Sequence, residues 1–390
     1  MRLDGDGSAA TWTHFGLVLT LLTGLGGCCA PGDDAKTARV HDAGTDAGLE
    51  SGLGGGSDAG LDGGSDGGSD AGTPDAGYVR VRRTGRFFEH RDRPIRSDLA
   101  NQGVATVERG HGGRSLGFKI TLADGTRAYF KPSQSFTGMS WQAELAAFHL
   151  DRELGLGRVA PSIGRRIDWS AIEPAAGDDR RVSELNVVDG QLDGALIWWV
   201  PERLRAVELP NGWQRWLRID DALPAVSPFQ RPLAYRERIA ALTDETEAPT
   251  VPSAPDPDRP DRPAELSDLM VFDYLIHNGD RWGTNNTNIR TLETGGPLMY
   301  LDNAAGFTMR RARTHLMDTR LAQVQRFRRS TIDAVRHFSM RRFQARLERD
   351  PLAPLLDEAQ LENFEVRRAY LLDYVDGLLE RFGQAQVYAW

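Results

Sequence analysis

The sequence predicts an α+β domain of two lobes, a small strand-rich lobe followed by a larger helical one, behind a long segment that does not fold. Three observations lead to this prediction. Residues 41–77 have almost no large apolar side chain, residues 104–131 alternate between short strand patterns and turns, and the stretches 266–276 and 362–382 have apolar residues at helical spacing. The 390 residues are 40% apolar and 26% charged, which excludes a collagen, a coiled coil and a wholly disordered protein.

The formal net charge of −8 belongs mainly to the N-terminal segment. Residues 41–77 hold eight acidic residues and no lysine or arginine, whereas residues 78–390 carry 44 bases and 43 acids. Because the folded part is nearly neutral, its charge predicts no polyanion-binding function and no nucleic-acid partner. The only cysteines are Cys28 and Cys29, so the rest of the chain can form neither a disulfide nor a cysteine metal site.

Residues 1–29 are predicted to be an export signal of the lipoprotein type. The apolar run at 15–25 is too short to cross a bilayer, and the tetrapeptide Leu25-Gly-Gly-Cys28 that follows resembles the lipobox of bacterial lipoproteins. Lipidation of Cys28 would anchor an exported protein to a bacterial membrane surface. The alternative is a disordered leader on a cytoplasmic protein.

Two segments are predicted to lie outside the packed structure. Residues 30–77 form a tether, since residues 41–77 repeat Asp-Ala-Gly and Gly-Gly-Ser-Asp units with 13 glycines and almost no large apolar side chain. Residues 249–263 hold six prolines and predict an exposed insertion, because neither a helix nor a central strand accepts that density of proline.

A glycine-rich turn separates the strand patterns 104–107 and 117–122. Glycine lets backbone N–H groups approach phosphate oxygens, so Gly110, Gly112 and Gly113 are candidate nucleotide-binding residues. The alternative is an ordinary hairpin turn, which has the same composition.

Lys131 ends the next strand pattern, and lysine is rare in this chain: there are three lysines against 44 arginines. A compact ammonium that must reach between phosphates is one reason to keep a lysine, and an ordinary surface lysine is the alternative. Residues 141–154 have the period of a helix with Glu144 in its early part. Its carboxylate either pairs with Lys131 or faces solvent.

The most informative pattern follows the insertion. A mostly buried helix over 266–276 leads into a polar loop with Asp280 and Asn285, and a strand over 297–301 ends at Asp302. This is the order of parts in kinase-type phosphoryl transfer. Asp280 would orient the attacking hydroxyl, while Asn285 and Asp302 would hold Mn²⁺ or Mg²⁺ against the phosphates of ATP. Any one of these residues alone is also a common turn former.

Five stretches together resemble the secretory-pathway kinases that include four-jointed and the Golgi casein kinase. They are Tyr129–Pro132, Ala143–Arg152, Gly157–Pro161, Phe272–Arg281 and Leu301–Phe307. The resemblance covers about residues 100–385. It implies an atypical two-lobed protein-kinase-like fold, ATP with Mn²⁺ or Mg²⁺ as cofactors, and phosphorylation of hydroxyls on exported proteins or sugars.

The resemblance also implies roles for particular residues. Lys131 matches the nucleotide lysine, Glu144 the helix glutamate, Asp280 the catalytic aspartate and Asp302 the metal aspartate. Asn285 matches the four-jointed side of the family, whereas the casein kinase side has a different residue there. The animal members have disulfides, which this chain cannot form, so its core must stabilise the fold alone.

Two further stretches allow both functional and structural interpretations. Trp198 and Trp199 would line an adenine pocket between the lobes or would be core aromatics. Residues 310–349, with twelve arginines and three acids, suggest a pair of helices, the second capped by Ser330 with Asp333 at its third position. They would bind an acidic acceptor or simply pair with acidic segments elsewhere.

The sequence therefore predicts an exported, membrane-anchored kinase that transfers the γ-phosphoryl group of ATP to a hydroxyl on a protein or glycan acceptor. The kinase-like domain would occupy residues 78–390, with an N-lobe over about 78–200 and a C-lobe over about 201–390. The alternatives are a nucleotide-binding pseudokinase and a surface-anchored interaction module.

Overall fold

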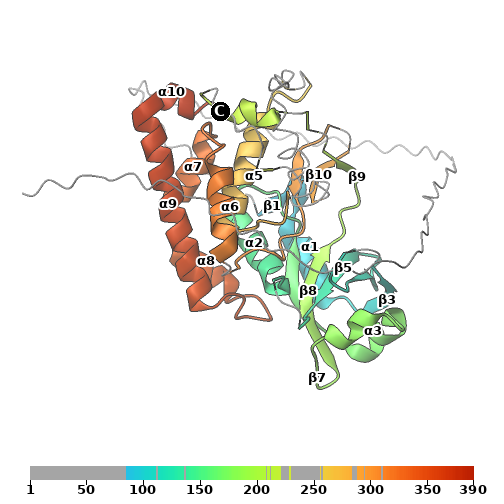
Figure 1. Ribbon diagram of the computed structural model, residues 1–390. Coiled ribbons are helices and arrows are strands. Elements are labelled where there is room, and N and C mark those ends of the chain that lie inside the picture. The colour runs from blue at the N-terminus through green and yellow to red at the C-terminus, as the bar shows by residue number, and fades with distance from the viewer. Residues whose placement is uncertain are drawn as a thin grey trace, which may run out of the picture. The chain divides into compact units, whose positions relative to one another are not determined.

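Figure 1 shows the computed structural model of the chain. The structure describes residues 85–390 except for 111–112, 136–137, 208, 211, 221–227, 230–254, 256–257, 283–287, 294 and 309–310. All described residues belong to the second of the two units into which the chain divides, Pro74–Trp390. The predicted signal segment with Cys28, the tether, Gly112, Asn285 and most of the insertion lie outside the described residues.

A twisted antiparallel sheet forms the N-terminal lobe. Its strand order is β3-β4-β5-β8-β6, and β7 pairs with the start of β8. The predicted hairpin joins β4 to β5, with Gly125 at a φ of 87° and the Leu122 N–H donating to the Thr126 carbonyl. The strands are β3 Val104–Arg109, β4 Phe118–Leu122, β5 Arg127–Pro132, β6 Ser162–Asp168, β7 Val187–Val188 and β8 Gln191–Trp198.

Two short helices that the sequence analysis did not predict pack on this sheet. They are α1, Asp92–Asn101, and α3, Trp169–Ala176, which is followed by the 3-10 turn η1, Arg180–Glu184. Each helix buries only a narrow apolar stripe, and α1 begins with charged residues and a proline, so neither has the long apolar period that marks a core helix. A hairpin of β1, Arg86–Phe87, and β2, His90–Arg91, precedes α1.

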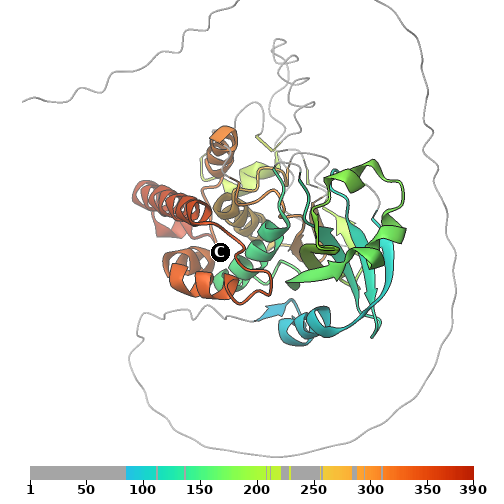
Figure 2. The same cartoon turned by 90° about the horizontal axis from the view of Figure 1, so that it is seen from below.

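Helix α2, Trp141–Leu154, contacts both the sheet and the helical lobe (Figures 1 and 2). The Ser140 hydroxyl accepts the Gln142 N–H at the N-terminus, and Gly155 ends the helix at a φ of 71°. Every residue of α2 from Ala143 to Leu154 is buried. A charged side chain on this helix therefore needs a partner inside the protein.

The C-terminal lobe is built on the predicted buried helix. This helix, α5, is wholly buried and packs against α6, α9, η2 and the small sheet β11-β10-β9. The elements are β9 Leu204–Ala206, η2 Trp213–Leu217, α5 Arg262–Ile276, β10 Ile289–Leu292, β11 Leu298–Tyr300, α6 Arg311–Leu321, α7 Arg329–Arg336, α8 Met340–Leu347, α9 Glu358–Phe382 and α10 Gln384–Val387.

The predicted insertion extends too far. Arg262 and Pro263, its last two residues, form the first turn of α5. Proline is well accepted there because the first helical N–H groups have no partner inside the helix. The predicted C-terminal core helix is confirmed as α9, which starts four residues earlier with a capping box of Asp357 and Gln360.

The arginine-rich region forms three helices, α6, α7 and α8, and the predicted pair is wrong. Ser330 does not cap α7, because the helix already starts at Arg329 with Arg328 as its N-cap. The buried carboxylate of Asp268 on α5 sets this start: it accepts the Arg328 guanidinium at 2.9 Å and the Thr331 hydroxyl at 2.6 Å. A tertiary contact thus replaces the local cap.

Several arginines of this region pair with carboxylates of other helices. Arg336 binds Asp376 on α9, and Glu153 on α2 accepts both Arg342, at 2.8 Å, and Arg346, at 3.0 Å. The alternative interpretation, in which these arginines pair with acidic residues elsewhere in the protein, therefore explains Arg336, Arg342 and Arg346.

The two tryptophans also have structural partners. Trp198 meets the rings of Phe87 and His90 edge-on, and the cations of Lys119 and Arg127 lie over the ring of Trp199 at 5.4 and 5.0 Å. Among the described residues, no helix has both the length and the apolar character needed to span a membrane.

Candidate active site

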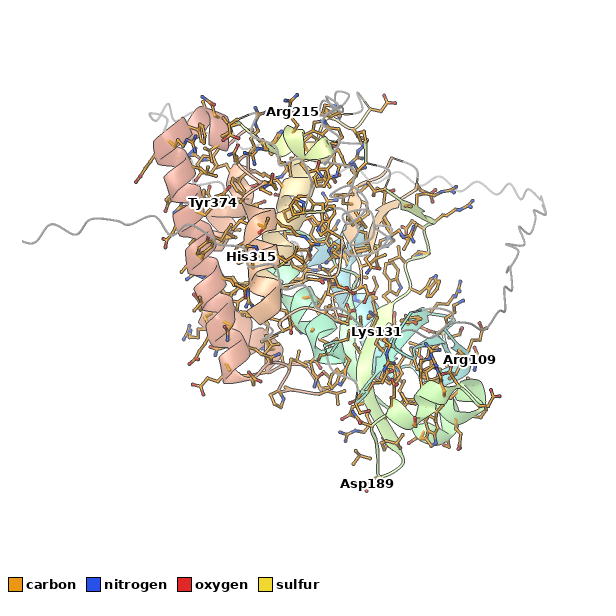
Figure 3. The ribbon with its side chains drawn as sticks, in the orientation of Figure 1. Arg109, Lys131, Asp189, Arg215, His315 and Tyr374 are labelled. Carbon is orange, nitrogen blue, oxygen red and sulfur yellow. The ribbon has the colours of Figure 1, made fainter. Side chains whose placement is uncertain are left out.

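Lys131 lies at the junction of the two lobes (Figure 3). Strand β5 pairs with β8 on one side and β4 on the other, which fixes the Lys131 backbone opposite Ala195. The Lys131 ammonium is 2.5 Å from a carboxylate oxygen of Glu144 and 2.6 Å from one of Asp302. These three residues come from a strand, a helix and a loop, and the structure brings them together. The sequence left the Lys131–Glu144 pair open as one of two alternatives and did not predict the pair with Asp302.

Glu144 is buried, and the alternative of a solvent-facing side chain is wrong. The oxygen that accepts Lys131 also accepts the Ala304 N–H at 3.0 Å. The Ala304 carbonyl in turn accepts the Ser140 N–H at 2.8 Å. The first turn of α2 is thereby bound to the loop that holds Asp302, so the position of the helix and the position of the loop depend on each other.

The charges of this cluster stabilise one another. Burial alone would lower the pKa of Lys131, but the carboxylates of Asp302 and Glu144 outweigh it and raise that pKa above its ordinary value. Lys131 holds the pKa of Asp302 below its ordinary value. Lys131 and Asp302 are therefore ionised throughout the range between their ordinary pKa values, about 4 and about 10.

Asp302 follows β11 and has an unusual backbone for a non-glycine residue, with a φ of 56°. Its carbonyl accepts the side-chain amide of Asn278 at 3.2 Å, and a hydrogen bond from Asn288 also favours its ionised carboxylate. A left-handed aspartate costs about 1 kcal/mol or more and persists only where the surroundings fix it. Here the strained backbone turns the carboxylate toward Lys131.

The loop with Asp280 starts where α5 ends. His277 has a φ of 60°, and the Asn278 N–H donates to the Asp273 carbonyl at 2.9 Å, which closes the helix. The Asn278 side chain is fully buried and binds both the Asp280 N–H and the Asp302 carbonyl, each at 3.2 Å. Asn278 thus links the backbones of Asp280 and Asp302. Among the described residues, no side chain pairs with the Asp280 carboxylate.

Arg281 is a second connecting residue that the sequence analysis did not single out. It is fully buried, and its Nε donates to both carboxylate oxygens of Asp273 at 2.7 Å. Its terminal nitrogens bind the Leu301 carbonyl and, at 2.6 Å, the side-chain oxygen of Asn303. The signal for this pair was available in the sequence, since a carboxylate inside an apolar helix such as 266–276 requires a buried partner.

The glycine loop has a structural explanation of its own. A Cβ on Gly110 would lie 2.6 Å from the Tyr129 hydroxyl oxygen, and one on Gly117 would lie 2.5 Å from it, so this ring requires glycine at both positions. Gly113 has a φ of 79°, a backbone conformation that glycine adopts without strain. Among the described residues, no hydrogen bond joins Gly110 or Gly113 to Lys131 or Asp302.

A cavity of about 240 Å³ opens beside the ion cluster, between β5 and the start of α2. Lys131 and Ala304 line it, and the other lining residues are mostly polar: Ser115, Pro132, Ser133, Gln134, Met139, Ser140, Trp141, Gln142 and Asn186. A polar cavity that ends on a buried ammonium is suited to an anionic ligand such as a chain of phosphates.

Asp302 has the chemistry of a ligand for a divalent cation. Its carboxylate is ionised, and its side chain is 39% exposed to solvent. Hard cations prefer such oxygen ligands and, next to nucleotides, need only one or two carboxylates besides the phosphates and water. The described residues contain no group of three or more His, Cys, Asp or Glu placed for a metal. Asn285, the other predicted ligand, lies outside them.

The sequence profile of one known family matches residues 186–387, and its description is Fam20C: Golgi casein kinase, C-terminal, Fam20. The match covers slightly more than half of the chain. The chain belongs to this family. The matched segment contains Asp280 and Asp302, whereas Lys131 and Glu144 precede it. As a member of the Fam20 family the chain is a kinase, which confirms the enzyme class that the order of motifs predicted.

Two human proteins are among its relatives. The chain is 24% identical over 328 residues to glycosaminoglycan xylosylkinase, with 74% of this chain and 75% of the relative covered. It is also 24% identical over 333 residues to the extracellular serine/threonine protein kinase FAM20C, where 73% of this chain and 54% of the relative are covered. The chain thus spans about half the length of FAM20C.

Solved structures confirm the two-lobed α+β kinase fold. The structure of hydra Fam20 with sugar aligns with a TM-score of 0.54 and 22% identity, over 75% of this chain and 90% of that one. The crystal structure of the Golgi casein kinase with Mn/ADP bound aligns with a TM-score of 0.55 and 19% identity, over 76% of this chain and 78% of that one.

The substitution Lys131→Arg tests whether the ion cluster needs a compact ammonium. The guanidinium fork is larger and reaches its partners along different directions, so we expect phosphotransfer to fall by at least about tenfold although the charge is kept. Lys119→Arg is the matched control, because Lys119 lies on the neighbouring strand over Trp199, away from the cluster. Initial rates of both variants are compared with the wild type. Near wild-type turnover of Lys131→Arg would make Lys131 an ordinary strand lysine.

Proposed function

We propose that this kinase transfers the γ-phosphoryl group of ATP to a hydroxyl of a protein or sugar, with Lys131, Glu144, Asp280 and Asp302 as its working residues. The observation that supports it best is the buried ammonium held between two carboxylates beside a polar cavity. In protein kinases an ion pair between a strand lysine and a helix glutamate positions the lysine on the phosphates of ATP. In this chain, too, the lysine lies on a strand, β5, and the glutamate on a helix, α2.

Each residue has a separate task in this proposal. Glu144 holds the Lys131 ammonium at the end of the cavity, where it binds phosphate oxygens. Asp280 accepts a hydrogen bond from the acceptor hydroxyl, aims its oxygen at the γ-phosphorus and takes its proton late in the transfer. Asp302 would hold Mn²⁺ or Mg²⁺, which when bound neutralises charge on the phosphates. Mn²⁺ is the metal named for the Golgi casein kinase structure.

The acceptor class is proposed only as a hydroxyl on a protein or a glycan. One human relative is named as a kinase of glycosaminoglycan xylose and another as a serine/threonine protein kinase, so both classes of hydroxyl occur among the relatives. The pseudokinase alternative differs in one respect: it binds ATP without transferring phosphate.

The substitution Asp280→Asn separates transfer from binding. If Asp280 acts on the acceptor hydroxyl, it contributes much to the transition state and little to ATP affinity. We expect turnover to fall by about 10²-fold or more, while the dissociation constant of ATP changes less than about threefold. ATP titration and initial phosphotransfer rates are measured on the same preparations.

The exposed Asp373 on α9 supplies the control, since Asp373→Asn makes the same chemical change far along the chain from the loop. A loss of thermal stability with parallel losses of binding and turnover would show that Asp280 only shapes the turn after α5. Tight ATP binding by the wild type with no phosphotransfer, in Mn²⁺ or Mg²⁺, would establish the pseudokinase alternative.

The substitution Asp302→Ala tests the proposed metal ligand. Asp302 is partly exposed, and Lys131 still pairs with Glu144 when Asp302 is removed, so the variant should keep its fold and lose most of the increase in ATP affinity that Mn²⁺ provides. ATP is titrated with and without Mn²⁺, and circular dichroism checks the fold. An unchanged Mn²⁺-dependent affinity in a folded variant would exclude Asp302 as a ligand.

We also propose that the protein is exported and held on a bacterial membrane surface by lipid on Cys28. This proposal rests on the apolar run at 15–25 and the lipobox-like tetrapeptide that follows it. Cys28→Ser should move the full-length protein from the membrane fraction to the soluble fraction of a bacterial host. Cys29→Ser is the matched control and should remain with the membrane. A wild-type protein found in the soluble fraction would support the disordered-leader alternative.

A further inference from the structure

A second cavity, of about 400 Å³, lies beside the second half of α2. Its lining comes from α1, from the second half of α2, from the end of α8 and the turn after it, and from Gly85 before β1: Gly85, Asp92, Arg93, Arg96, Phe148, His149, Arg152, Arg346 and Arg349. The two cavities share no lining residue. On α2 the first cavity is lined by Trp141 and Gln142 at the start of the helix, and the second by Phe148, His149 and Arg152. The two cavities therefore lie along different parts of α2.

The second cavity has an excess of positive charge at its wall. Asp92 is the only acidic residue that lines it, against five arginines. Arg152 is neutralised, because Asp92 binds it through two hydrogen bonds of 2.7 and 2.9 Å and Asp151 binds it as well. Arg346 shares the Glu153 carboxylate with a neighbouring arginine.

Among the described residues, the other three arginines have no carboxylate within ion-pair distance. Arg93 and Arg349 are exposed, and Arg96 donates its Nε to the Ser162 carbonyl at 3.0 Å. Burial lowers the pKa of Arg96; the carboxylates of Asp350 and Asp92 act to raise it, and the charges of Arg152 and Arg346 act to lower it. Five guanidinium groups against one lining carboxylate favour an anion at this wall.

A buried polar atom at the same place also lacks a partner. His149 lines the cavity and is only 4% exposed, yet its Nε2 accepts or donates no hydrogen bond among the described residues. An Asp350 carboxylate oxygen is 4.0 Å from this nitrogen, within ion-pair distance but beyond a hydrogen bond. A buried ring nitrogen without a hydrogen bond is costly unless a molecule from solution supplies one.

We infer that this cavity binds a tetrahedral oxyanion, the phosphate or sulfate ester of a larger molecule, at a site separate from the nucleotide. Arg93, Arg96 and Arg349 would supply charged donors, and His149 one further hydrogen bond. The volume exceeds what a bare phosphate needs and falls in the range of ordinary ligand pockets, which leaves space for a sugar or peptide that carries the ester. The inference does not depend on the proposed roles of Lys131, Asp280 or Asp302.

Thermal stability of the full chain in inorganic phosphate or sulfate, against sodium chloride at equal ionic strength, tests the site. We expect both oxyanions to stabilise the wild type, and the double variant Arg93→Gln/Arg349→Gln to bind phosphate at least about tenfold more weakly. Arg341→Gln is the matched control: this exposed arginine is on α8, eight residues before Arg349, but does not line the cavity. Should the double variant fold poorly, Arg349→Gln alone is measured. Wild-type phosphate binding by the variants would overturn the inference.

Two further measurements separate the sites and the carriers. Saturating ADP with Mn²⁺ should leave phosphate binding at this cavity intact, and loss of binding would show that the anion was in the nucleotide cavity. A phosphoserine peptide and a sugar phosphate are then compared as competitors of inorganic phosphate. Competition by either one supports the site and identifies its carrier, whereas competition by neither overturns it.

Discussion

The architecture around the candidate active site depends on one largely buried cation, Lys131, whose side chain is 15% exposed. An ammonium removed from water is stable only when carboxylates or other acceptors replace its hydration. Lys131 meets this condition through Glu144 and Asp302, which come from parts of the chain 13 and 171 residues away. For Lys131 to pair with both carboxylates, the sheet, the first turn of α2 and the loop after β11 must therefore lie next to one another. The hydrogen bonds of Ala304 to that turn of α2 follow from the same requirement.

A second buried cation organises the loop that carries Asp280 in the same way. The Arg281 guanidinium is fully buried and binds Asp273 in α5, the Leu301 carbonyl and the side chain of Asn303. Removing one partner of such a set leaves an unpaired buried charge, which is strongly destabilising. Arg281 binds the residues on either side of Asp302 in the chain, Leu301 and Asn303, while Lys131 binds the Asp302 carboxylate. The strained backbone of Asp302 is thus fixed by two ionic networks.

The sequence was informative where local patterns decide structure. Helix α2 begins and ends at the predicted residues, because Ser140 and Gly155 supply local caps and the apolar period between them is uninterrupted. The order of Lys131, Glu144, Asp280 and Asp302 was likewise visible in the chain. What escaped prediction depends on contacts distant in sequence: the role of Asn278 between two loops, the Arg281 network, and the start of α7. There, Asp268 from another helix determines the cap, and no pattern within residues 328–336 contains that information.

The two ends of α2 show how the same residue types give different sites. At the ion cluster two carboxylates lie within 2.6 Å of the Lys131 ammonium, so its position is fixed. At the second cavity, carboxylates neutralise Arg152 and engage Arg346, whereas Arg93, Arg96 and Arg349 have no ion pair with any described residue. Balanced charge makes a rigid element, whereas unmatched charge creates affinity for an anion. Because one rigid helix carries both arrangements, an anion bound at the second cavity would contact the same element that positions Glu144.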